Sequence, residues 1–371
     1  GMTGASAARW LAESGARVLV IDAREHAGGN CYDVLDAHGL RIHLYGPHIF
    51  HTSRPEVVDF LSRFTPWRPY EHRVVGLIDN RLVPLPINLT SIAMLFPGAA
   101  GQGLVTRLVE TFGYGAKVPI LALRASPYEE LADLAAYVYA RVFEGYTRKQ
   151  WGLSPEDIDP AITGRVPVRV SYDDRYFTDS FQCMPAQGFS PLFSAMLQHK
   201  NITLRTGTAF ATVGNVQWKQ CIYTGPMDEY WGACHGCLPY RSLDFVFEHY
   251  AQEQHLPVGV VNYPHFEVPF TRISEYRHLT GQQSQGDKAL GTTVSLEYPR
   301  AHEAGATIPY YPIRTEASVD ILHRYQLTAQ REAPNIVFAG RLGAFAYLNM
   351  DEAVLAGLAA ARRVGDALRR I

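Results

Sequence analysis

The clearest pattern of hydrophobic and polar positions lies in the first forty residues. Small and apolar residues over 5–12 are typical of a helix, which Ser14-Gly15 ends. The apolar run over 17–22 predicts a buried strand that ends in an acid, Asp22. A glycine turn, a helix, a strand and an acid in this order are typical of the second half of a dinucleotide-binding βαβ unit. Gly1 and Gly4 take the second and third glycine positions of the G-x-G-x-x-G pattern, so we expect a Rossmann-type fold without its first strand.

Further along the chain the periodicity changes twice. Helical periodicity and early prolines over 89–150 predict a helical insertion, and strands predicted at 266–271 and 292–297 belong to an antiparallel sheet. A helix at 190–199, strands at 203–205, 221–224 and 335–340, and a final Ala-rich helix return to the nucleotide-binding core. We therefore expect an α/β fold with three domains. The predicted ranges are 1–85, 190–240 and 325–371 for the Rossmann-type domain, 86–160 for the helical domain with a mobile lid, and 161–189 and 241–324 for the sheet domain.

Composition narrows the functional classes. The 371 residues carry a formal net charge of -2, which argues against a nucleic-acid binder. No apolar run approaches the roughly 20 residues that a membrane span needs, so we expect a cytoplasmic protein. The five cysteines do not resemble a disulfide framework, and the Cys234-x-x-Cys237 pair lacks the second half of a zinc site. We expect no metal.

Several short motifs have the residue types that a nucleotide ligand requires. Gly28-Gly29-Asn30 follows the acidic strand end. Glycines there permit close approach of a diphosphate, and the alternative is an ordinary turn without a ligand. The segment 46–52 holds two histidines, His48 and His51, in a loop headed by Gly-Pro. His48 is the better candidate for a ligand contact, and a metal pair would need a third ligand nearby.

A second group of motifs combines aromatic rings with cations. The segment 145–152 suits a base, a sugar and a phosphate, and its alternative is a helix end with a core tryptophan. Guanidinium groups bind diphosphate bidentately. The arginines in question are Arg165 and Arg169, which alternate on one strand face, together with Arg272 and Arg341.

Twelve segments in collinear order give the chain a family resemblance. They are GGN (28–30), YGPHIFHT (45–52), WRPYEHRV (67–74), PLPINL (84–89), GYTRKQWG (145–152), RVPVR (165–169), DDRYF (173–177), YTGPMD (223–228), LPYRSL (238–243), TRISEY (271–276), PYYPI (309–313) and GRLGAFAYLNMDEAV (340–354). Together they resemble the UDP-galactopyranose mutase family from one end of the chain to the other.

The resemblance implies an FAD-binding Rossmann-type domain, a helical domain with a lid, and a twisted antiparallel sheet. It also implies interconversion of UDP-galactopyranose and UDP-galactofuranose through an adduct between the sugar and N5 of reduced FAD. The implied partners are a UDP-sugar substrate and an electron donor that reduces FAD. For the oligomeric state, both a monomer and a homo-oligomer remain alternatives.

The resemblance also assigns roles to individual positions. Arg165, on the lid, Arg272 and His48 are the implied catalytic residues. The implied substrate contacts are Tyr146, Thr147, Trp151, Tyr176, Tyr311, Tyr347 and Asn349. The implied cofactor contacts are Gly1, Gly4, Asp22, Gly28, Gly29, Asn30, His48, Arg341 and Met350.

Two positions depart from the family. Val142 stands where many relatives carry a base-stacking Phe, with Phe143 beside it, and the segment 301–308 is longer than expected. These departures keep open a sister mutase that acts on another nucleotide hexose, such as a UDP-N-acetyl or dTDP-deoxy sugar. An FAD-dependent amine oxidase shares the Rossmann signature without the arginine and tyrosine set, and a non-enzymatic flavin-binding protein is the third alternative.

Overall fold

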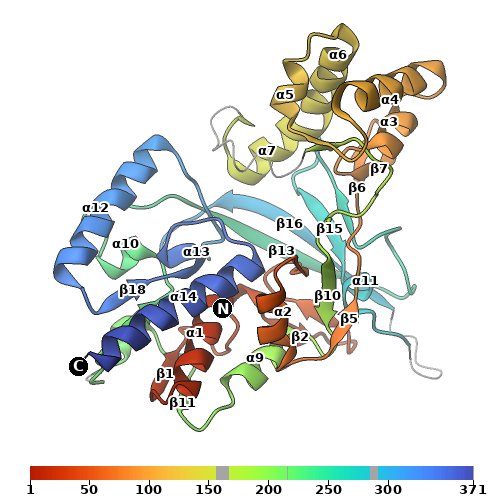
Figure 1. Ribbon diagram of the computed structural model, residues 1–371. Coiled ribbons are helices and arrows are strands. Elements are labelled where there is room, and N and C mark those ends of the chain that lie inside the picture. Colours follow the sequence, from red (N-terminus) through yellow and green to blue (C-terminus); the bar gives the residue numbers. More distant parts are fainter. Residues whose placement is uncertain (156–166, 215, 285–290, 371) are drawn as a thin grey trace. The chain divides into compact units, whose positions relative to one another are not determined.

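The computed structural model describes residues 1–155, 167–214, 216–284 and 291–370. The chain forms two units, and Figure 1 labels their elements. Unit 1 comprises residues 1–70, 179–242 and 302–371, and unit 2 comprises residues 71–178 and 243–301. The predicted helical segment 86–160 and most of the predicted sheet segments share unit 2. The division into three domains stays a prediction.

Unit 1 contains the nucleotide-binding elements that the sequence predicts. Helix α1 (Met2–Glu13) lies along the last helix, α14 (Met350–Arg369), and the two approach closely because Gly357 has no side chain. A Cβ there would lie 2.3 Å from the carbonyl oxygen of Thr3. Strand β1 (Val18–Ile21) pairs in parallel with β11 (Ile202–Arg205), and β12 (Cys221–Tyr223) pairs in parallel with β18 (Ile336–Phe338). These strands confirm the expectations for this part of the chain.

The remaining elements of unit 1 surround these two sheets. A hairpin joins β2 (Asp33–Leu35) to β3 (Arg41–His43), and a three-stranded sheet has the order β4-β10-β5. Its strands are β4 (Phe50–Thr52), β10 (Phe181–Pro185) and β5 (Trp67–Pro69). The helices are α2 (Pro55–Ser62), α9 (Phe189–Leu197), α10 (Met227–Tyr230), α12 (Glu316–Glu332) and α13 (Gly340–Gly343), with short 3-10 turns at Gly29–Cys31 and Phe210–Thr212.

Unit 2 is built on a sheet with the strand order β13-β16-β15-β14-β6-β7. The strands are β13 (Tyr240–Tyr250), β16 (Thr292–Ala301), β15 (Arg272–Glu275), β14 (Val260–Asn262), β6 (Val74–Ile78) and β7 (Arg81–Leu85). Strand β13 starts in unit 1, where its first two residues pair with β17 (Tyr311–Pro312). β14 and β6 run parallel, whereas β14–β15, β15–β16 and β6–β7 are antiparallel.

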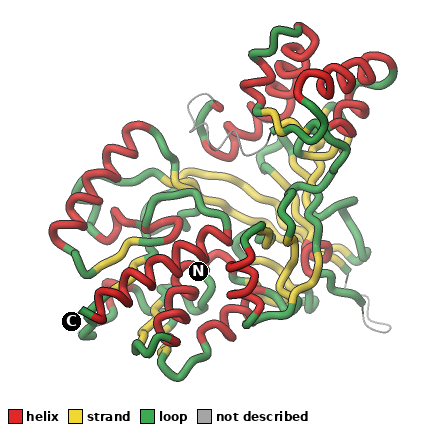
Figure 2. Tube along the Cα trace, viewed as in Figure 1, coloured by secondary structure: helices red, strands yellow, loops and turns green. Residues whose placement is uncertain are grey.

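Most helices of unit 2 lie close together near β6 and β7, as the labels of Figure 1 and the red helices of Figure 2 show. They are α3 (Leu89–Leu95), α4 (Ala99–Phe112), α5 (Ile120–Arg124), α6 (Glu129–Val138), a π-helical turn (Tyr139–Phe143) and α7 (Glu144–Trp151). Short strands β8 (Lys117–Val118) and β9 (Val168–Arg169) pair beside them, and α11 (Tyr276–Thr280) follows β15. The predicted helical insertion is confirmed.

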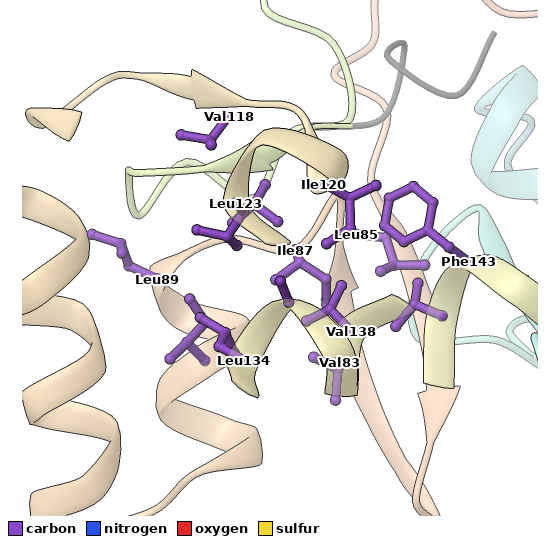
Figure 3. Close-up of a cluster of buried hydrophobic side chains, with 14 of the residues drawn as sticks. Val83, Leu85, Ile87, Leu89, Val118, Ile120, Leu123, Leu134, Val138 and Phe143 are labelled. Carbon is purple, nitrogen blue, oxygen red and sulfur yellow. The ribbon is translucent and has the colours of Figure 1, made fainter. Parts of the chain in front are cut away.

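One hydrophobic cluster joins the helices of unit 2 to its sheet (Figure 3). Val83 and Leu85 of β7 lie in it with Leu134 and Val138 of α6. Phe143 belongs to the same cluster, together with its neighbour Val142, and both are 8% exposed. Position 142 is therefore a core position in this chain, and Phe143 is equally buried.

The prediction of a strand at 266–271 is wrong. These residues belong to the loop between β14 and β15, which contains both Pro264 and Pro269. The strand starts only at Arg272. Several carbonyl groups of the loop accept hydrogen bonds from Lys149, a side chain more than a hundred positions earlier in the chain. These contacts replace the ladder that a strand would need.

Candidate functional site

The glycine turn after β1 lies against the start of α1. Gly28 and Gly29 have φ values of +101° and +60°, which side chains rarely adopt. A Cβ on Gly29 would lie 3.0 Å from the Cα of Gly1, and a Cβ on Gly28 would lie 2.9 Å from the ring of Phe193. Gly29 therefore allows the turn to approach the N-terminus of α1, where backbone N–H groups favour anions, and Gly28 allows it to pack against Phe193 of α9.

Asp22 and Asn30 meet around an arginine that the sequence analysis did not single out. The Asp22 carboxylate accepts from the Arg24 backbone N–H at 3.0 Å, and Arg24 Nη2 donates to Asn30 Oδ1 at 2.8 Å. The guanidinium lies 4.4 Å above the ring of Tyr45. Its Nη1 is buried and has no hydrogen-bond partner among the residues that the structure describes. A buried donor of this kind suits an oxygen-rich ligand.

His48 is oriented by a second, buried histidine. The His48 backbone N–H donates to His43 Nδ1 at 2.9 Å, and burial, with Arg41 nearby, lowers the pKa of His43 to about 3. His48 Nδ1 lies 2.9 Å from the carbonyl of Gly46, which can only accept, so Nδ1 carries the proton. A neutral His48 ring then has its lone pair on Nε2. His51 Nδ1 instead contacts Asp179 at 2.8 Å.

Arg341 lies beside two stacked tyrosines. The rings of Tyr311 and Tyr347 are 5.6 Å apart and nearly parallel, and the Arg341 guanidinium carbon lies 5.4 Å and 5.2 Å from their centroids. Arg341 also donates to the carbonyls of Tyr310 (3.3 Å) and Leu348 (2.6 Å). The next two predicted residues start a helix, because Asn349 is the N-cap of α14 and Met350 its first residue.

In unit 2, a buried carboxylate fixes Arg272. Its Nε and Nη2 donate to Glu297 Oε2 at 2.9 Å and 2.7 Å. The Glu297 side chain is 2% exposed and the Arg272 side chain 23% exposed, so the arginine keeps a solvent-facing part. Nothing in the sequence linked these two residues, which lie 25 positions apart. The pairing follows from the antiparallel register of β15 and β16.

The remaining substrate candidates of unit 2 lie on α7 and near β9. Thr147 and Trp151 are buried at 8% exposure, and Tyr146 is half-buried. The Tyr176 backbone N–H donates to the His72 carbonyl at 2.6 Å, and its carbonyl accepts from Arg169 Nη2 at 2.5 Å. Arg169, expected on the same face as Arg165, is therefore engaged with the backbone. Arg165 lies outside the described residues.

The predicted cofactor and substrate residues divide between the units. All predicted cofactor contacts lie in unit 1: Gly1, Gly4, Asp22, Gly28, Gly29, Asn30, His48, Arg341 and Met350. A Cβ on Gly4 would lie 3.9 Å from the Thr224 side chain, which is an ordinary contact distance. The substrate candidates Tyr311, Tyr347 and Asn349 also lie in unit 1, whereas Tyr146, Thr147, Trp151, Tyr176 and Arg272 lie in unit 2.

The described ranges contain no group of three or more His, Cys, Asp or Glu side chains that could hold a metal. In the same ranges, no helix is long and apolar enough to cross a membrane. The two cysteines of the Cys234-x-x-Cys237 pair are exposed and not joined by a disulfide.

Comparison with known proteins first defines the class of fold. A family model described as an NAD(P)-binding Rossmann-like domain matches residues 1–64. A crystal structure of reduced UDP-galactopyranose mutase aligns over 99% of this chain and 92% of its own, with a TM-score of 0.73 and 16% identity. A redesigned putrescine oxidase aligns with a TM-score of 0.51 and 12% identity. The chain thus has a Rossmann-type α/β fold that a mutase and an oxidase share.

The family follows from sequence similarity. The model described as UDP-galactopyranose mutase matches residues 141–347. A probable UDP-galactopyranose mutase of Klebsiella pneumoniae is 35% identical, over 96% of this chain and 91% of that protein. The UDP-galactopyranose mutase of Mycoplasma pneumoniae is 33% identical (98% and 94% covered), and the dTDP-fucopyranose mutase of Escherichia coli is 33% identical (95% and 93%). The chain belongs to the UDP-galactopyranose mutase family and is an isomerase, which confirms the resemblance.

Proposed function

We propose that the protein interconverts UDP-galactopyranose and UDP-galactofuranose with bound FAD in its reduced form. The observation that carries the proposal is Arg272, which a buried carboxylate holds in a fixed orientation while the arginine side chain as a whole remains 23% exposed. Diphosphate is the leaving group of such a reaction, and a pre-oriented guanidinium stabilises the charge that develops on it.

The residues of unit 1 fit FAD. The two glycines permit close approach of a diphosphate, and Asp22 has the position of a ribose-binding acid. Arg24 presents a buried donor that finds no partner within the described part of the chain. Reduced FAD supplies the nucleophile, N5, for the anomeric carbon of the sugar. In our proposal Gly1, Gly4, Gly28, Gly29 and Asn30 surround the cofactor diphosphate. His48, Arg341 and Met350 contact the flavin.

Cys31, which is buried, and Cys221, which is half-buried, are poor candidates for a protein nucleophile. Burial raises the pKa of the Cys31 and Cys221 thiols to about 11 in each case. At neutral pH both remain thiols, and the thiolate is the reactive form. This chemistry favours a nucleophile from the cofactor.

The protein side chains bind and orient the substrate. Arg272 and Arg165 bind the departing diphosphate, and the hydroxyl groups of Tyr311 and Tyr347 donate to its oxygens without adding charge. The uridine contacts are Tyr146 and Thr147, and further substrate contacts come from Trp151, Tyr176 and Asn349. These assignments follow the family positions and the exposure of Arg272.

The test is turnover of UDP-galactose with and without a reductant. The purified protein, loaded with FAD, is incubated with UDP-galactose either with dithionite under nitrogen or fully oxidised in air, and the two UDP-sugars are separated by anion exchange. We expect UDP-galactofuranose only under reducing conditions, with no net consumption of the reductant. Equal turnover by oxidised protein, or peroxide released in proportion to turnover, would contradict the mutase proposal and favour the oxidase.

A second candidate is a sister mutase that acts on a dTDP-deoxy sugar. A dTDP-fucopyranose mutase shares 33% identity over 95% of this chain, and Val142 and Phe143 are both buried in the core, so neither presents an aromatic ring to a base. The same assay with dTDP-fucose in parallel decides between the substrates. If kcat/KM is at least ten times higher for dTDP-fucose than for UDP-galactose, dTDP-fucose becomes the assigned substrate.

A further inference from the structure

The loop between β14 and β15, residues 263–270, encloses the ammonium group of Lys149 from α7. The ammonium lies within hydrogen-bond distance of four backbone carbonyls, and because it has three N–H groups, at least one N–H is shared between two acceptors. The acceptors are the carbonyl oxygens of Tyr263, His265 (2.8 Å), Val268 (3.0 Å) and Phe270 (3.0 Å). One side chain thus organises nearly the whole loop.

A glycine one turn earlier brings the helix backbone against the same loop. Gly145 and Lys149 are four positions apart and lie on one face of α7. A Cβ on Gly145 would lie 2.1 Å from the carbonyl oxygen of Pro264. Helix and loop are therefore in direct backbone contact at Gly145 and joined by the ammonium group at Lys149.

The loop ends at a residue of the proposed diphosphate site. The Tyr263 N–H donates to the Thr271 carbonyl at 2.8 Å, and Asn262 pairs with Arg272 across the hairpin. Arg272 follows Phe270, one of the four acceptors, by two positions, and is itself held by Glu297. The loop therefore leads directly into β15 at Arg272, whose backbone also pairs with Asn262 of β14 and Glu297 of β16.

The contact between α7 and the loop also involves the proposed uridine site. Tyr146 and Thr147 lie between Gly145 and Lys149 on α7. When the face with Gly145 and Lys149 is fixed against the loop, the rotation of the helix about its axis is also fixed. The directions in which Tyr146 and Thr147 point from the helix are then set by the same contacts.

We propose that Lys149 is a positioning residue that sets the spacing between the uridine contacts on α7 and the diphosphate contact Arg272. The inference rests on the proposed function, because it assumes that one nucleoside diphosphate reaches both groups. Its consequence is specific. Loss of Lys149 weakens a ligand that spans both groups more than a ligand that touches only one.

The charge state of Lys149 is compatible with this role. Burial lowers the pKa of its ammonium to about 8, so the group remains protonated near neutral pH. Four carbonyl dipoles replace the water that burial removes. Lys149→Met keeps most of the aliphatic stem and removes the donors. Arg148→Met is the matched control, since Arg148 is the neighbouring cation and forms an exposed ion pair with Glu144 at 3.1 Å.

The experiment measures binding of a nucleoside and of its diphosphate to the FAD-loaded protein. Dissociation constants are determined for UDP and uridine, and for dTDP and thymidine, so that either base preference gives a usable pair. For the preferred pair we expect Lys149→Met to weaken the diphosphate about tenfold and the nucleoside less than twofold. In turnover, KM should rise by a similar factor with kcat within threefold, whereas Arg148→Met should match the wild type.

A second variant approaches the same contact from the other side. Gly145→Ala leaves Lys149 intact and forces the loop away from α7, so it should reproduce the unequal loss. Hydrogen exchange of the amides in 263–270 should rise in both variants and not in Arg148→Met. Equal weakening of nucleoside and diphosphate, unchanged binding, or unchanged loop exchange in folded Lys149→Met would overturn the inference. A wild-type protein that binds neither UDP nor dTDP would instead overturn the proposed function, and the inference with it.

Discussion

The two units hold their key arginines in different ways. In unit 1, Arg341 lies beside two tyrosine rings and donates to two backbone carbonyls, which fix it without a formal negative charge. In unit 2, Arg272 is held by the buried carboxylate of Glu297. Arg341 therefore retains more of its positive field, whereas Arg272 has part of its charge offset and its direction fixed more firmly. The first arrangement suits attraction of an electron-rich cofactor, and the second suits a precise contact to a leaving group.

The largest expected effect tests the unit 2 arrangement. Arg272→Met should lower kcat/KM for the nucleotide sugar by about a hundredfold or more, because the variant lacks the proposed charge-assisted contact to the departing diphosphate. Flavin content should remain at the wild-type level. Arg300→Met is the control, since Arg300 forms an exposed pair with Asp244 in the same unit. If the turnover of Arg272→Met lies within threefold of that control, the assignment of Arg272 as a diphosphate contact is wrong.

The corresponding change in unit 1 should have the opposite pattern. Arg341→Met removes the contacts to both rings and both carbonyls, and we expect FAD affinity to fall by about 1.5–3 kcal/mol. Flavin retained after gel filtration measures the loss. Arg331→Met, which removes a highly exposed arginine paired with Glu332, should retain normal flavin. If Arg341→Met kept its flavin and lost only substrate affinity, the contrast between the two arginines would disappear.

A third prediction concerns the backbone of unit 1. Gly28 and Gly15 have similar φ values, +101° and +93°, but a Cβ on Gly28 would meet Phe193 and a Cβ on Gly15 would meet nothing within 4 Å. Both alanine variants therefore carry the conformational cost, and only Gly28→Ala adds a steric conflict of about 1–3 kcal/mol. Urea unfolding measures the difference in stability. If the two variants are equally stable, the turn accommodates a Cβ at Gly28 and does not depend on the absence of a side chain there.

Local patterns were sufficient to predict much of the fold. The strand at 18–21 and the helix before it were predicted because an apolar run and a glycine stop depend on neighbouring residues only. The segment 266–271 has the composition of a strand, yet Lys149 from α7 takes up its carbonyls. That interaction joins residues more than a hundred positions apart, which no periodicity can reveal.

The candidate site was predicted less completely than the fold. The glycine turn and His48 lie in recognisable motifs, whereas Arg24 was missed although it follows the predicted ribose acid by two positions. That spacing was an available signal. Glu297 had none, because its role depends on the register between two strands. The shared strand face of Arg165 and Arg169 suggested diphosphate binding for both, but Arg169 donates to the carbonyls of Arg175 and Tyr176.

The smallest expected effect tests whether unit 2 uses buried carboxylates more generally to hold cations. Glu275 is fully buried and accepts from the backbone N–H groups of His255 and Leu256 and from the Thr292 hydroxyl. His278 Nε2 lies 3.4 Å from the Glu275 carboxylate and 3.0 Å from the Leu256 carbonyl, and the interaction with the carboxylate, with a smaller contribution from the carbonyl, raises the pKa of His278.

A raised pKa in the folded state means that the folded protein binds the His278 proton more tightly than the unfolded chain does. The stabilisation is therefore fully present below the ordinary histidine pKa of about 6.5 and is lost as the pH rises through the higher folded value. His278→Gln should lower the free energy of unfolding by on the order of 1 kcal/mol at pH 6, and by less at pH 8.5. His38→Gln, at an exposed position in unit 1, controls for the loss of a histidine as such. Urea unfolding at both pH values measures the free energy of unfolding of each variant. If the loss of stability in His278→Gln is as large at pH 8.5 as at pH 6, His278 contributes through packing and not through the ion pair with Glu275.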